Sequence, residues 1–236
     1  MTTEAASTAL RDFISKLNVD AVGVVSLAEW KGTQLEESAL RLLPQARSVV
    51  VLAMEVYREF LDLVSPGRVT GEASFNDLVE ANSDFVNSKL TEASYGVARA
   101  SHELGLRALP LPAAGSPTDD RFLQAVFSYK HAALAAGLGT IGKNSLLITQ
   151  EYGPRIRLSC CLTEVLLEQT RCDKPWKCAG CRICIAGCPS EALSEPQDGE
   201  VYSLNRFACS SFLSASDGCY ECLRLCPAGQ RGKRPL

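Results

Sequence analysis

Apolar residues recur along the first 169 residues with the spacings of amphipathic helices and buried strands. Leu10, Ile14 and Leu17 fall on one face of a helix predicted over residues 3–17, with Thr3 as its expected N-cap. Similar spacings predict helices over residues 35–43, 75–104 and 120–136, the second with room for one break. Continuous apolar runs predict strands over residues 21–27, 48–56, 107–111, 146–149 and 156–167. Because helices and strands mix without strict alternation, the pattern predicts an α+β layered domain.

The pattern changes near residue 170, where apolar strand sequence gives way to Cys, Pro and Gly. A shift of this kind is typical of a boundary between two folded parts of a chain. We therefore predict two domains, residues 1–169 and residues 170–236.

Composition and charge exclude several classes of protein. The chain is 46% hydrophobic and 22% charged with a net charge of -3, which is ordinary for a globular protein and gives no basic footprint for nucleic acid. The short basic tail of Arg231, Lys233 and Arg234 is better explained by solubility. The first residues lack a basic segment followed by an apolar one, and no apolar run reaches the length of a membrane span. These features predict a cytoplasmic protein without a membrane partner.

The cysteines are concentrated at one end of the chain. None of the eleven precedes Cys160, and nine lie between Cys172 and Cys226. A cytoplasmic compartment keeps thiols reduced, so clustered cysteines indicate metal ligation rather than disulfides.

Two cysteine runs have the spacing of bacterial ferredoxins. Residues 178–189 read C-x2-C-x2-C-x3-C-P, and residues 219–227 repeat the end of that run. Nine residues separate Cys209 from Cys219. In such folds the fourth cysteine of each run binds the other cluster. The predicted ligands of one [4Fe-4S] cluster are Cys178, Cys181, Cys184 and Cys226. Those of the second [4Fe-4S] cluster are Cys188, Cys209, Cys219 and Cys222.

Zinc is the alternative metal, because it also binds four thiolates. Zinc sites usually pair two C-x2-C knuckles, and the C-x3-C-P endings do not match them. Three further cysteines are left over. Cys160 and Cys161 lie in an apolar strand, so at least one of them is expected to face the core as a small hydrophobic residue. A structural role is expected for all three, Cys172 included.

A glycine-rich segment, AGLGTIGKNSLLITQEYGPR at residues 136–155, precedes the cysteine runs. Gly137, Gly139 and Gly142 spell the G-x-G-x-x-G pattern of dinucleotide sites. That fingerprint must follow a strand, whereas here it follows a predicted helix, so we reject a dinucleotide site. The glycines instead predict a tight backbone loop that a large group approaches closely.

Taken together, AGLGTIGKN, LLIT, EYGPR, LTEVLLE and the two cysteine runs resemble the corrinoid-dependent iron–sulfur reductases, which include epoxyqueuosine reductases and reductive dehalogenases. Residues 42–57 (LLPQARSVVVLAMEVY) extend the resemblance. It implies a nitroreductase-like layered domain followed by a bacterial-type 2[4Fe-4S] ferredoxin domain, with a base-off cobalamin between them. Electrons from an external low-potential donor, such as a ferredoxin or flavodoxin, would pass through the clusters to cobalt.

The resemblance also implies site residues. The residues expected to line the corrinoid cavity are Gly137, Gly139, Gly142, Lys143, Asn144, Tyr152, Gly153 and Arg155. Epoxyqueuosine reductases carry an acidic proton donor shortly before this loop in a D-x-x-P context. The nearest match here, Asp120 in SPTDDRF, differs in register and is equally explained as a solvated turn residue. His131 is the other candidate donor, although a lone His on a helix is often structural.

Three functions remain open at this stage. The chain is either a corrinoid-dependent reductase of a small substrate, a carrier or reductive activator of a corrinoid protein, or a ferredoxin-like electron carrier without corrinoid. A flavin is an alternative cofactor, because nitroreductase-like folds hold either group.

Overall fold

The structure is a computed structural model that describes residues 2–64, 75–114, 118–172, 177–216 and 218–229. The basic tail lies outside these residues. The chain divides into two units that interleave along the sequence. Unit 1 comprises Met1–Met54, Val86–Leu138 and Arg157–Lys174, and unit 2 comprises Glu55–Phe85, Gly139–Ile156 and Pro175–Leu236. The predicted division into domains at residues 169 and 170 stays a prediction.

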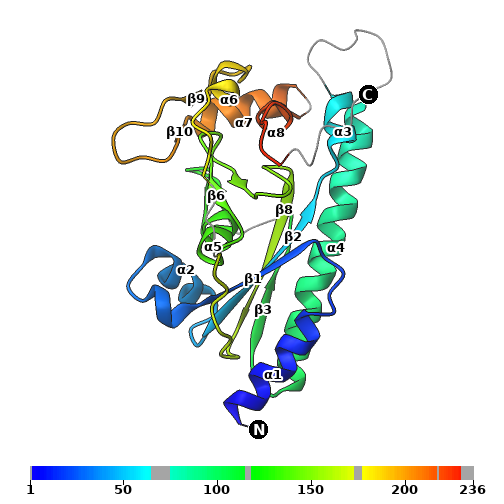
Figure 1. Ribbon diagram of the computed structural model, residues 1–236, viewed down its shortest axis with the longest axis vertical. Helices are drawn as coiled ribbons and strands as arrows, with labels where there is room; N and C mark the ends of the chain where they lie inside the picture. Colours follow the sequence, from blue (N-terminus) through cyan, green and yellow to red (C-terminus); the bar gives the residue numbers. More distant parts are fainter. Residues whose placement is uncertain (1, 65–74, 115–117, 173–176, 217, 230–236) are drawn as a thin grey trace. The chain divides into compact units, whose positions relative to one another are not determined.

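Unit 1 is built on a four-stranded sheet in the order β1-β2-β8-β3 (Figure 1). Its strands are β1 (Ala21–Ser26), β2 (Ser48–Glu55), β3 (Ala108–Leu111) and β8 (Ile156–Thr163). The pairs β1–β2 and β3–β8 are antiparallel. Residues 48–53 of β2 are buried without a break, which requires cover on both faces of the sheet.

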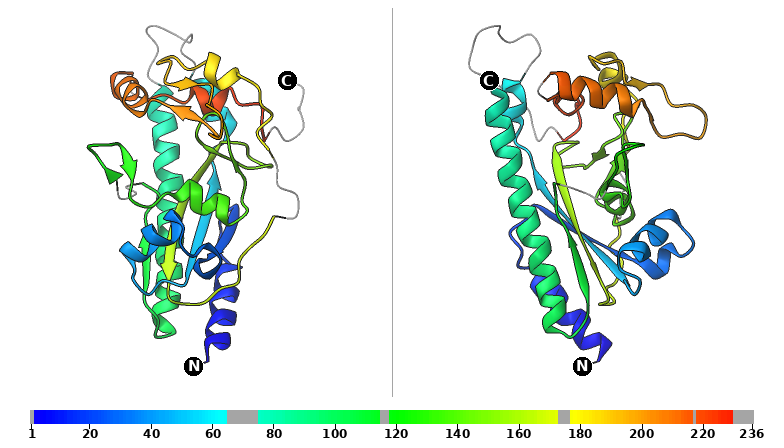
Figure 2. Two further views of the ribbon diagram at one scale, coloured as in Figure 1. Left: turned by 90° about the vertical axis from the view of Figure 1, so that its left-hand side faces the viewer. Right: turned by 180° about the vertical axis from the view of Figure 1, so that it is seen from behind.

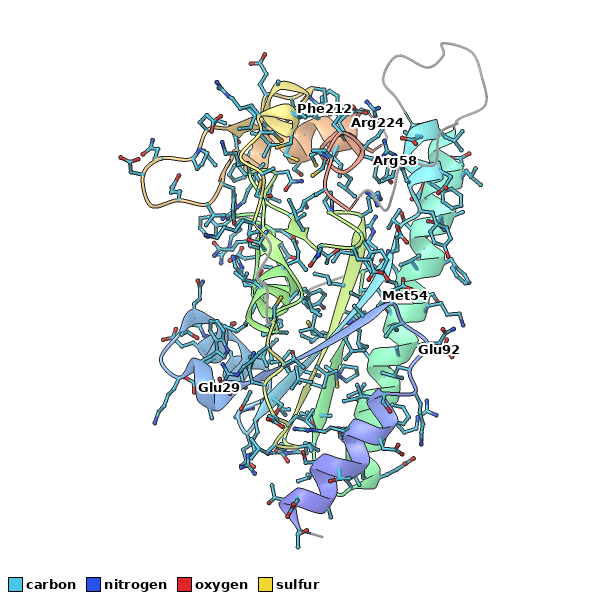
Figure 3. The ribbon with its side chains drawn as sticks, in the orientation of Figure 1. Glu29, Met54, Arg58, Glu92, Phe212 and Arg224 are labelled. Carbon is cyan, nitrogen blue, oxygen red and sulfur yellow. The ribbon has the colours of Figure 1, made fainter. Side chains whose placement is uncertain are left out.

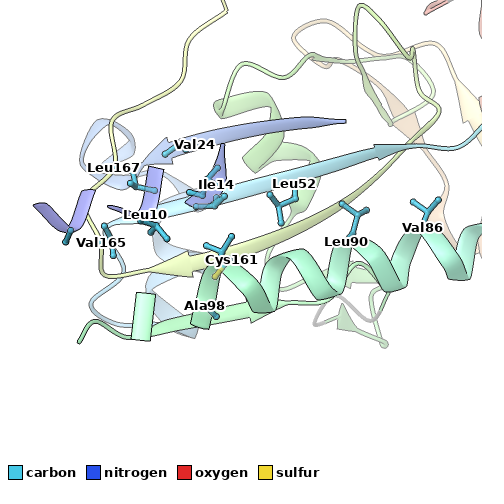
Figure 4. Packing of buried hydrophobic residues seen from close by; sticks show 13 residues of the cluster. Leu10, Ile14, Val24, Leu52, Val86, Leu90, Ala98, Cys161, Val165 and Leu167 are labelled. Atoms are coloured by element: carbon cyan, nitrogen blue, oxygen red, sulfur yellow. The ribbon is translucent and has the colours of Figure 1, made fainter. Parts of the chain in front are cut away.

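Two helices, α1 (Thr3–Ile14) and α4 (Phe75–Glu103), carry the residues that cover one face of this sheet. Figure 4 shows Leu10 of α1 and Leu90 of α4 directed toward Leu52 and Cys161 of the strands. Helix α4 runs without the break that its sequence pattern allowed. The N-cap of α1 is Thr2, one residue earlier than the predicted Thr3, because the Thr2 hydroxyl accepts the N–H of Ala5.

The other face of the sheet is covered by α5 (Tyr129–Ala135), which lies opposite α4 (Figure 2). Contact is closest at Gly23 of β1, where an added Cβ would lie 2.7 Å from the Cβ of Ala136. The short elements η1 (Leu27–Trp30) and α2 (Gln34–Leu42) follow β1, and Arg171 pairs with Glu29 of η1. The mixture of helices and strands confirms the predicted α+β class.

The helix predicted over residues 120–136 is wrong in its first half. Residues 118–125 form a small hairpin, β4 (Thr118–Asp119) and β5 (Gln124–Ala125), before α5 begins at Tyr129. The Asp119 carboxylate accepts the backbone N–H of Arg121, and Leu123 has a φ of 48°. Such a local hydrogen bond competes with helix formation, and a left-handed residue interrupts a helix. The strands predicted over residues 146–149 and 156–167 are also shorter in the structure.

Unit 2 contains short elements joined by turns. They are α3 (Arg58–Leu63), β6 (Thr140–Ile141), β7 (Leu147–Ile148), α6 (Ile183–Ala186), β9 (Leu193–Ser194), β10 (Ser203–Leu204), α7 (Arg206–Ala215) and α8 (Glu221–Arg224). A small apolar cluster of Val56, Leu61 and Val79, with Tyr220 and Leu223 against it, joins α3 to α8. Within the described ranges, no helix has the length and apolar character needed to cross a membrane.

Candidate functional site

The first cysteine run surrounds α6. Cys178 and Cys181 precede this one-turn helix, Cys184 is buried within it, and Cys188 follows it. Helix α6 packs against α8, and an added Cβ on Gly187 would lie 2.3 Å from Leu225 Cδ1. The two cysteine runs therefore lie side by side within unit 2.

The second run uses α7 and α8. Cys209 lies in α7, whose N-terminus is capped by the Asn205 side chain, while Cys222 lies in α8 between Cys219 and Cys226. Beside Cys222, the buried Glu221 pairs with Arg224 through two hydrogen bonds of 3.2 and 2.6 Å (Arg224 is labelled in Figure 3). The hydrogen bonds that Arg224 donates to the Glu221 carboxylate raise the pKa of Arg224.

One group of four thiols is revealed by their mutual electrostatic effect. Burial raises the pKa of Cys184, and the nearby thiols of Cys181, Cys178 and Cys226 raise it further. Burial also raises the pKa of Cys226, with Cys178 and Cys181 acting in the same direction. Cys226 of the second run therefore lies among the first three cysteines of the first run.

The remaining four thiols form a second group. Burial raises the pKa of Cys222 to about 12, with further contributions from Cys219, Cys209, Cys188 and, more weakly, Cys184. Burial raises the pKa of Cys209, which Cys188 and Cys219 also raise. The fourth cysteine of the first run thus lies among cysteines of the second.

Cys188 differs from Cys184, Cys209, Cys222 and Cys226, because hydrogen bonds to its thiolate lower its pKa overall. Burial opposes ionisation, but the Ser190 hydroxyl and the backbone N–H groups of Leu193, Ala192 and Ser190 lower the pKa of Cys188 overall. The Cys188 Sγ lies 3.5 Å from the Ser190 Oγ. A thiolate held by backbone donors is ready to bind a metal.

These two groups of four fit the ligand sets expected for two cubanes. Four thiolates close together repel one another, and a bound cationic iron centre would offset that repulsion. Across the described part of the chain, no three His, Cys, Asp or Glu side chains converge closely enough to hold a single metal ion. A cubane offers four separate iron atoms, so its ligands need not converge on one point as those of zinc do. The identity of the metal stays a prediction.

The three other cysteines lie in unit 1. Cys160 and Cys161 are fully buried in β8, as predicted, and burial raises the pKa of Cys160 well above its usual range and that of Cys161 to about 12. Cys172 is exposed.

The glycine-rich segment is shaped by contacts within the chain. Gly137 ends α5 with a φ of 73°, so a helix does precede the pattern and the rejection of a dinucleotide site is supported. Added Cβ atoms on Gly139 and Gly142 would lie 2.3 Å from the Ile148 carbonyl oxygen and 2.2 Å from Ile148 Cδ1. The last two glycines are therefore required by the β6–β7 hairpin itself.

Two polar residues of this loop connect it to the cysteine runs. The Lys143 Nζ lies 2.7 Å from Glu195, which also accepts the Arg182 Nε at 2.6 Å. The Asn144 side chain donates to the Cys222 carbonyl at 3.2 Å and accepts the N–H of Leu146. The pairs Lys143–Glu195 and Asn144–Cys222 are far apart in the sequence, so no local sequence pattern could have predicted these contacts.

The segment containing Tyr152 and Arg155 holds the end of the second run. Thr149 and Gly153 exchange two backbone hydrogen bonds, and the Thr149 hydroxyl accepts the N–H of Tyr152. The buried Arg155 donates to the carbonyls of Ala228 and Gly229. Lys143, Asn144 and Arg155 thus have partners within unit 2. Their predicted role in lining a corrinoid cavity stays a prediction.

The two candidate proton donors lie in unit 1. Asp120 is exposed in the β4–β5 turn, and its neighbour Asp119 has a lowered pKa because the Arg121 side chain donates to it. His131 lies in α5 with its Nδ1 2.8 Å from the Ser128 Oγ. Burial and the charge of Lys130 lower the pKa of His131. Catalysis by either residue stays a prediction.

We expect the His131 imidazole to be neutral at pH 7 and to titrate below its ordinary value of about 6.5, because burial and Lys130 disfavour the charged form. The chain has two histidines, so in the His102→Gln variant one imidazole remains to be followed by NMR between pH 4 and 8. The pKa of His131 is lower in the folded protein than in the unfolded one. The neutral imidazole therefore contributes to the stability of the fold above about pH 6.5, and this contribution is lost as the pH falls through the folded pKa. A midpoint above 6.5 would contradict the assignment.

Comparisons with known proteins agree with the cysteine pattern. No protein-family model matches the chain. A tetrachloroethene reductive dehalogenase of Desulfitobacterium hafniense is 32% identical over 162 residues, which is 59% of this chain and 27% of that protein. An epoxyqueuosine reductase of Synechocystis is 24% identical over 242 residues, which is 91% of this chain and 74% of that protein. The chain thus spans about a quarter of the dehalogenase and about three quarters of the reductase.

Solved structures show the same fold. A reductive dehalogenase whose description refers to B12-dependent dehalogenation superimposes with a TM-score of 0.71 at 18% identity. The match covers 94% of this chain and 32% of that protein.

Proposed function

We propose that this chain is an iron–sulfur oxidoreductase that carries electrons through two [4Fe-4S] clusters. The proposal rests on its relation to the reductive dehalogenase and epoxyqueuosine reductase family. The electrons would reduce a bound base-off cobalamin that acts on a small substrate. An external low-potential carrier, such as a ferredoxin or flavodoxin, would supply them.

The observation that supports this proposal is the crossed grouping of the eight thiols in unit 2. Each group of four takes three cysteines from one part of the sequence and one from another, as the two-cluster ferredoxin pattern requires. Clusters joined in this way belong to one small fold, which keeps them close enough for electrons to pass between them. Low-potential electron transfer is the chemistry that such a pair supplies.

The bound corrinoid is proposed from the similarity of this chain to reductive dehalogenases and epoxyqueuosine reductases. When bound, it would supply a reducible cobalt that reacts with a substrate. The residues of this chain would contribute the loop of residues 137–144 and the turn of residues 152–155, whose backbones are fixed by the contacts of Ile148 and Ala228.

A second function is favoured by one observation. Lys143, Asn144 and Arg155 are bonded within unit 2, so the side chains expected around a corrinoid already have partners. An electron carrier or reductive activator that passes electrons to a separate corrinoid protein needs no such side chains. This alternative keeps the clusters and drops the bound cobalamin.

The deciding experiment adds cob(II)alamin to anaerobically purified full-length protein and records its EPR spectrum. The primary function predicts that the splitting from the cobalamin's own base nitrogen disappears, because the base-off form is bound. An unchanged spectrum, in protein that contains both clusters, would leave the electron-carrier function. The matched control is protein from which the clusters have been removed by a chelator. This control separates binding of cobalamin by the chain from reduction of cobalamin by the clusters.

Substrate chemistry is tested separately. Cobalamin reduced to Co(I) by dithionite in the presence of the protein should be reoxidised by a true substrate. Organic halides, epoxides and queuosine precursors form the panel to be followed by absorbance. Reoxidation by none of them would favour the activator over the reductase.

A further inference from the structure

Arg155 is a buried cation at the end of the second cysteine run. It lies in the turn before β8, and its side chain is 6% exposed. Its two terminal nitrogens donate to the carbonyls of Ala228 (3.4 Å) and Gly229 (2.8 Å). These residues follow Cys226 and Pro227 directly, so the guanidinium holds the backbone next to a predicted cluster ligand.

The third nitrogen of this guanidinium, Nε, donates no hydrogen bond to the described residues. The Arg155 Nε is buried and finds no hydrogen-bond acceptor among the residues that the structure describes. A buried donor left without a partner is destabilising, so native proteins usually supply an acceptor. The charge of Arg155 also acts on the Cys226 sulfur, where it opposes the effect of burial. Both features point to an electron-rich group beside Cys226 that is not part of the chain.

Glu55 provides a counter-charge at the end of β2. Its Oε1 lies 3.7 Å from an Arg155 terminal nitrogen, and the adjacent Val56 N–H donates to the Arg155 carbonyl at 2.8 Å. The Glu55 side chain is 24% exposed, whereas that of Arg155 is 6% exposed, so water screens the carboxylate more than the guanidinium. The net field at Cys226 should therefore be positive.

We infer that Arg155 is a positioning residue of the iron–sulfur cluster held by Cys178, Cys181, Cys184 and Cys226, and that it raises the reduction potential of that cluster. This inference rests on the proposed clusters. Reduction adds one electron and hence one negative charge to the cluster, which a buried cation stabilises. The Arg155 Nε would act in the same direction if it donated a hydrogen bond to a sulfur atom of the cluster. Glu55 opposes both effects.

The test measures the midpoint potentials of both clusters in anaerobic full-length protein by redox titration monitored by EPR. Arg155→Gln, which removes the charge, should make one of the two potentials more negative. Arg155→Lys, which keeps the charge, should stay nearer to the wild-type value. Glu55→Gln, which removes the counter-charge, should make the same potential more positive. Arg11→Gln, which removes an exposed charge screened by water, serves as the control and should change neither potential.

The outcomes separate this inference from the proposed function. Wild-type protein without iron would overturn the clusters themselves. Two intact clusters whose potentials do not differ among these variants would overturn only the role of Arg155. Equal shifts in Arg155→Gln and Arg155→Lys would also overturn it, because geometry rather than charge would then be the cause. If Arg155→Gln fails to fold, the Glu55→Gln variant still tests the inference. A cluster potential that is unchanged or more negative in Glu55→Gln contradicts it.

Discussion

Replacement of Cys184 by alanine should leave the protein with about four irons and four acid-labile sulfides, where the wild type is expected to hold about eight of each. Cys184 is buried in α6 and lies close to Cys178, Cys181 and Cys226. The four remaining described cysteines of unit 2 are the predicted ligands of the other cluster, so we expect the cluster to be lost rather than rearranged. Metal binding contributes to folding free energy, and unit 2 should also unfold at a lower temperature. Iron and sulfide analysis, EPR and thermal denaturation measure these effects.

The matched control is Cys172→Ala. Cys172 is an exposed cysteine in unit 1 that lies outside both groups of four, so this variant should keep the full iron content and the wild-type stability. A Cys184→Ala protein that retained all of its iron would contradict the ligand assignment. Loss of iron in the Cys172 variant would show that the two groups are incomplete.

The sequence predicted those parts of the fold in which local pattern and tertiary packing agree. The apolar runs at β1 and β2 are buried on both faces, and the helical spacing of Leu10 and Leu90 places them against the sheet. The short gaps within each cysteine run likewise place neighbouring cysteines around the one-turn helices α6 and α8. These signals depend on residues a few positions apart.

The sequence failed where a single side chain overrides the apolar pattern. Phe122 and Val126 lie within the helix predicted over residues 120–136, yet both are exposed, and the hydrogen bond from the Arg121 N–H to Asp119 forms a turn instead. The spacing of apolar residues does not show what they pack against.

Long-range contacts at the candidate site could not be predicted at all. Glu195 joins Lys143 to Arg182, and Arg155 holds a backbone more than seventy residues away. Residues 139–156 consequently fall in the same unit as the cysteine runs, although they lie before the predicted domain boundary. Lys143 and Arg155 were predicted to contact a cofactor, which stays a prediction, and their contacts with carboxylates and carbonyls of the chain were not foreseen.

Replacement of Gly153 by alanine should destabilise the protein by about 3 kcal/mol or more, through two effects that add. Gly153 has a φ of 61°, which costs a residue with a Cβ about 1–2 kcal/mol. The added Cβ would also lie 2.1 Å from the Ala228 carbonyl oxygen, so the backbone after Cys226 must move. A protein of this length loses roughly 2–4 °C of melting temperature per kcal/mol. Thermal denaturation and iron content measure the two consequences, and we expect the cluster that includes Cys226 to be the one affected.

Gly199→Ala separates the two effects. Gly199 has a φ of 87°, but no atom lies within 4 Å of its added Cβ, so this variant carries only the conformational cost and should keep all of its iron. The difference between the variants therefore measures the contact of the Gly153 turn with Ala228. Equal losses of stability and unchanged iron in both would show that this turn does not position Cys226. A selective loss of iron in Gly153→Ala would mean that the glycine in EYGPR is required by the approach of the cluster segment, which is the same contact that brings Arg155 to the end of the second run.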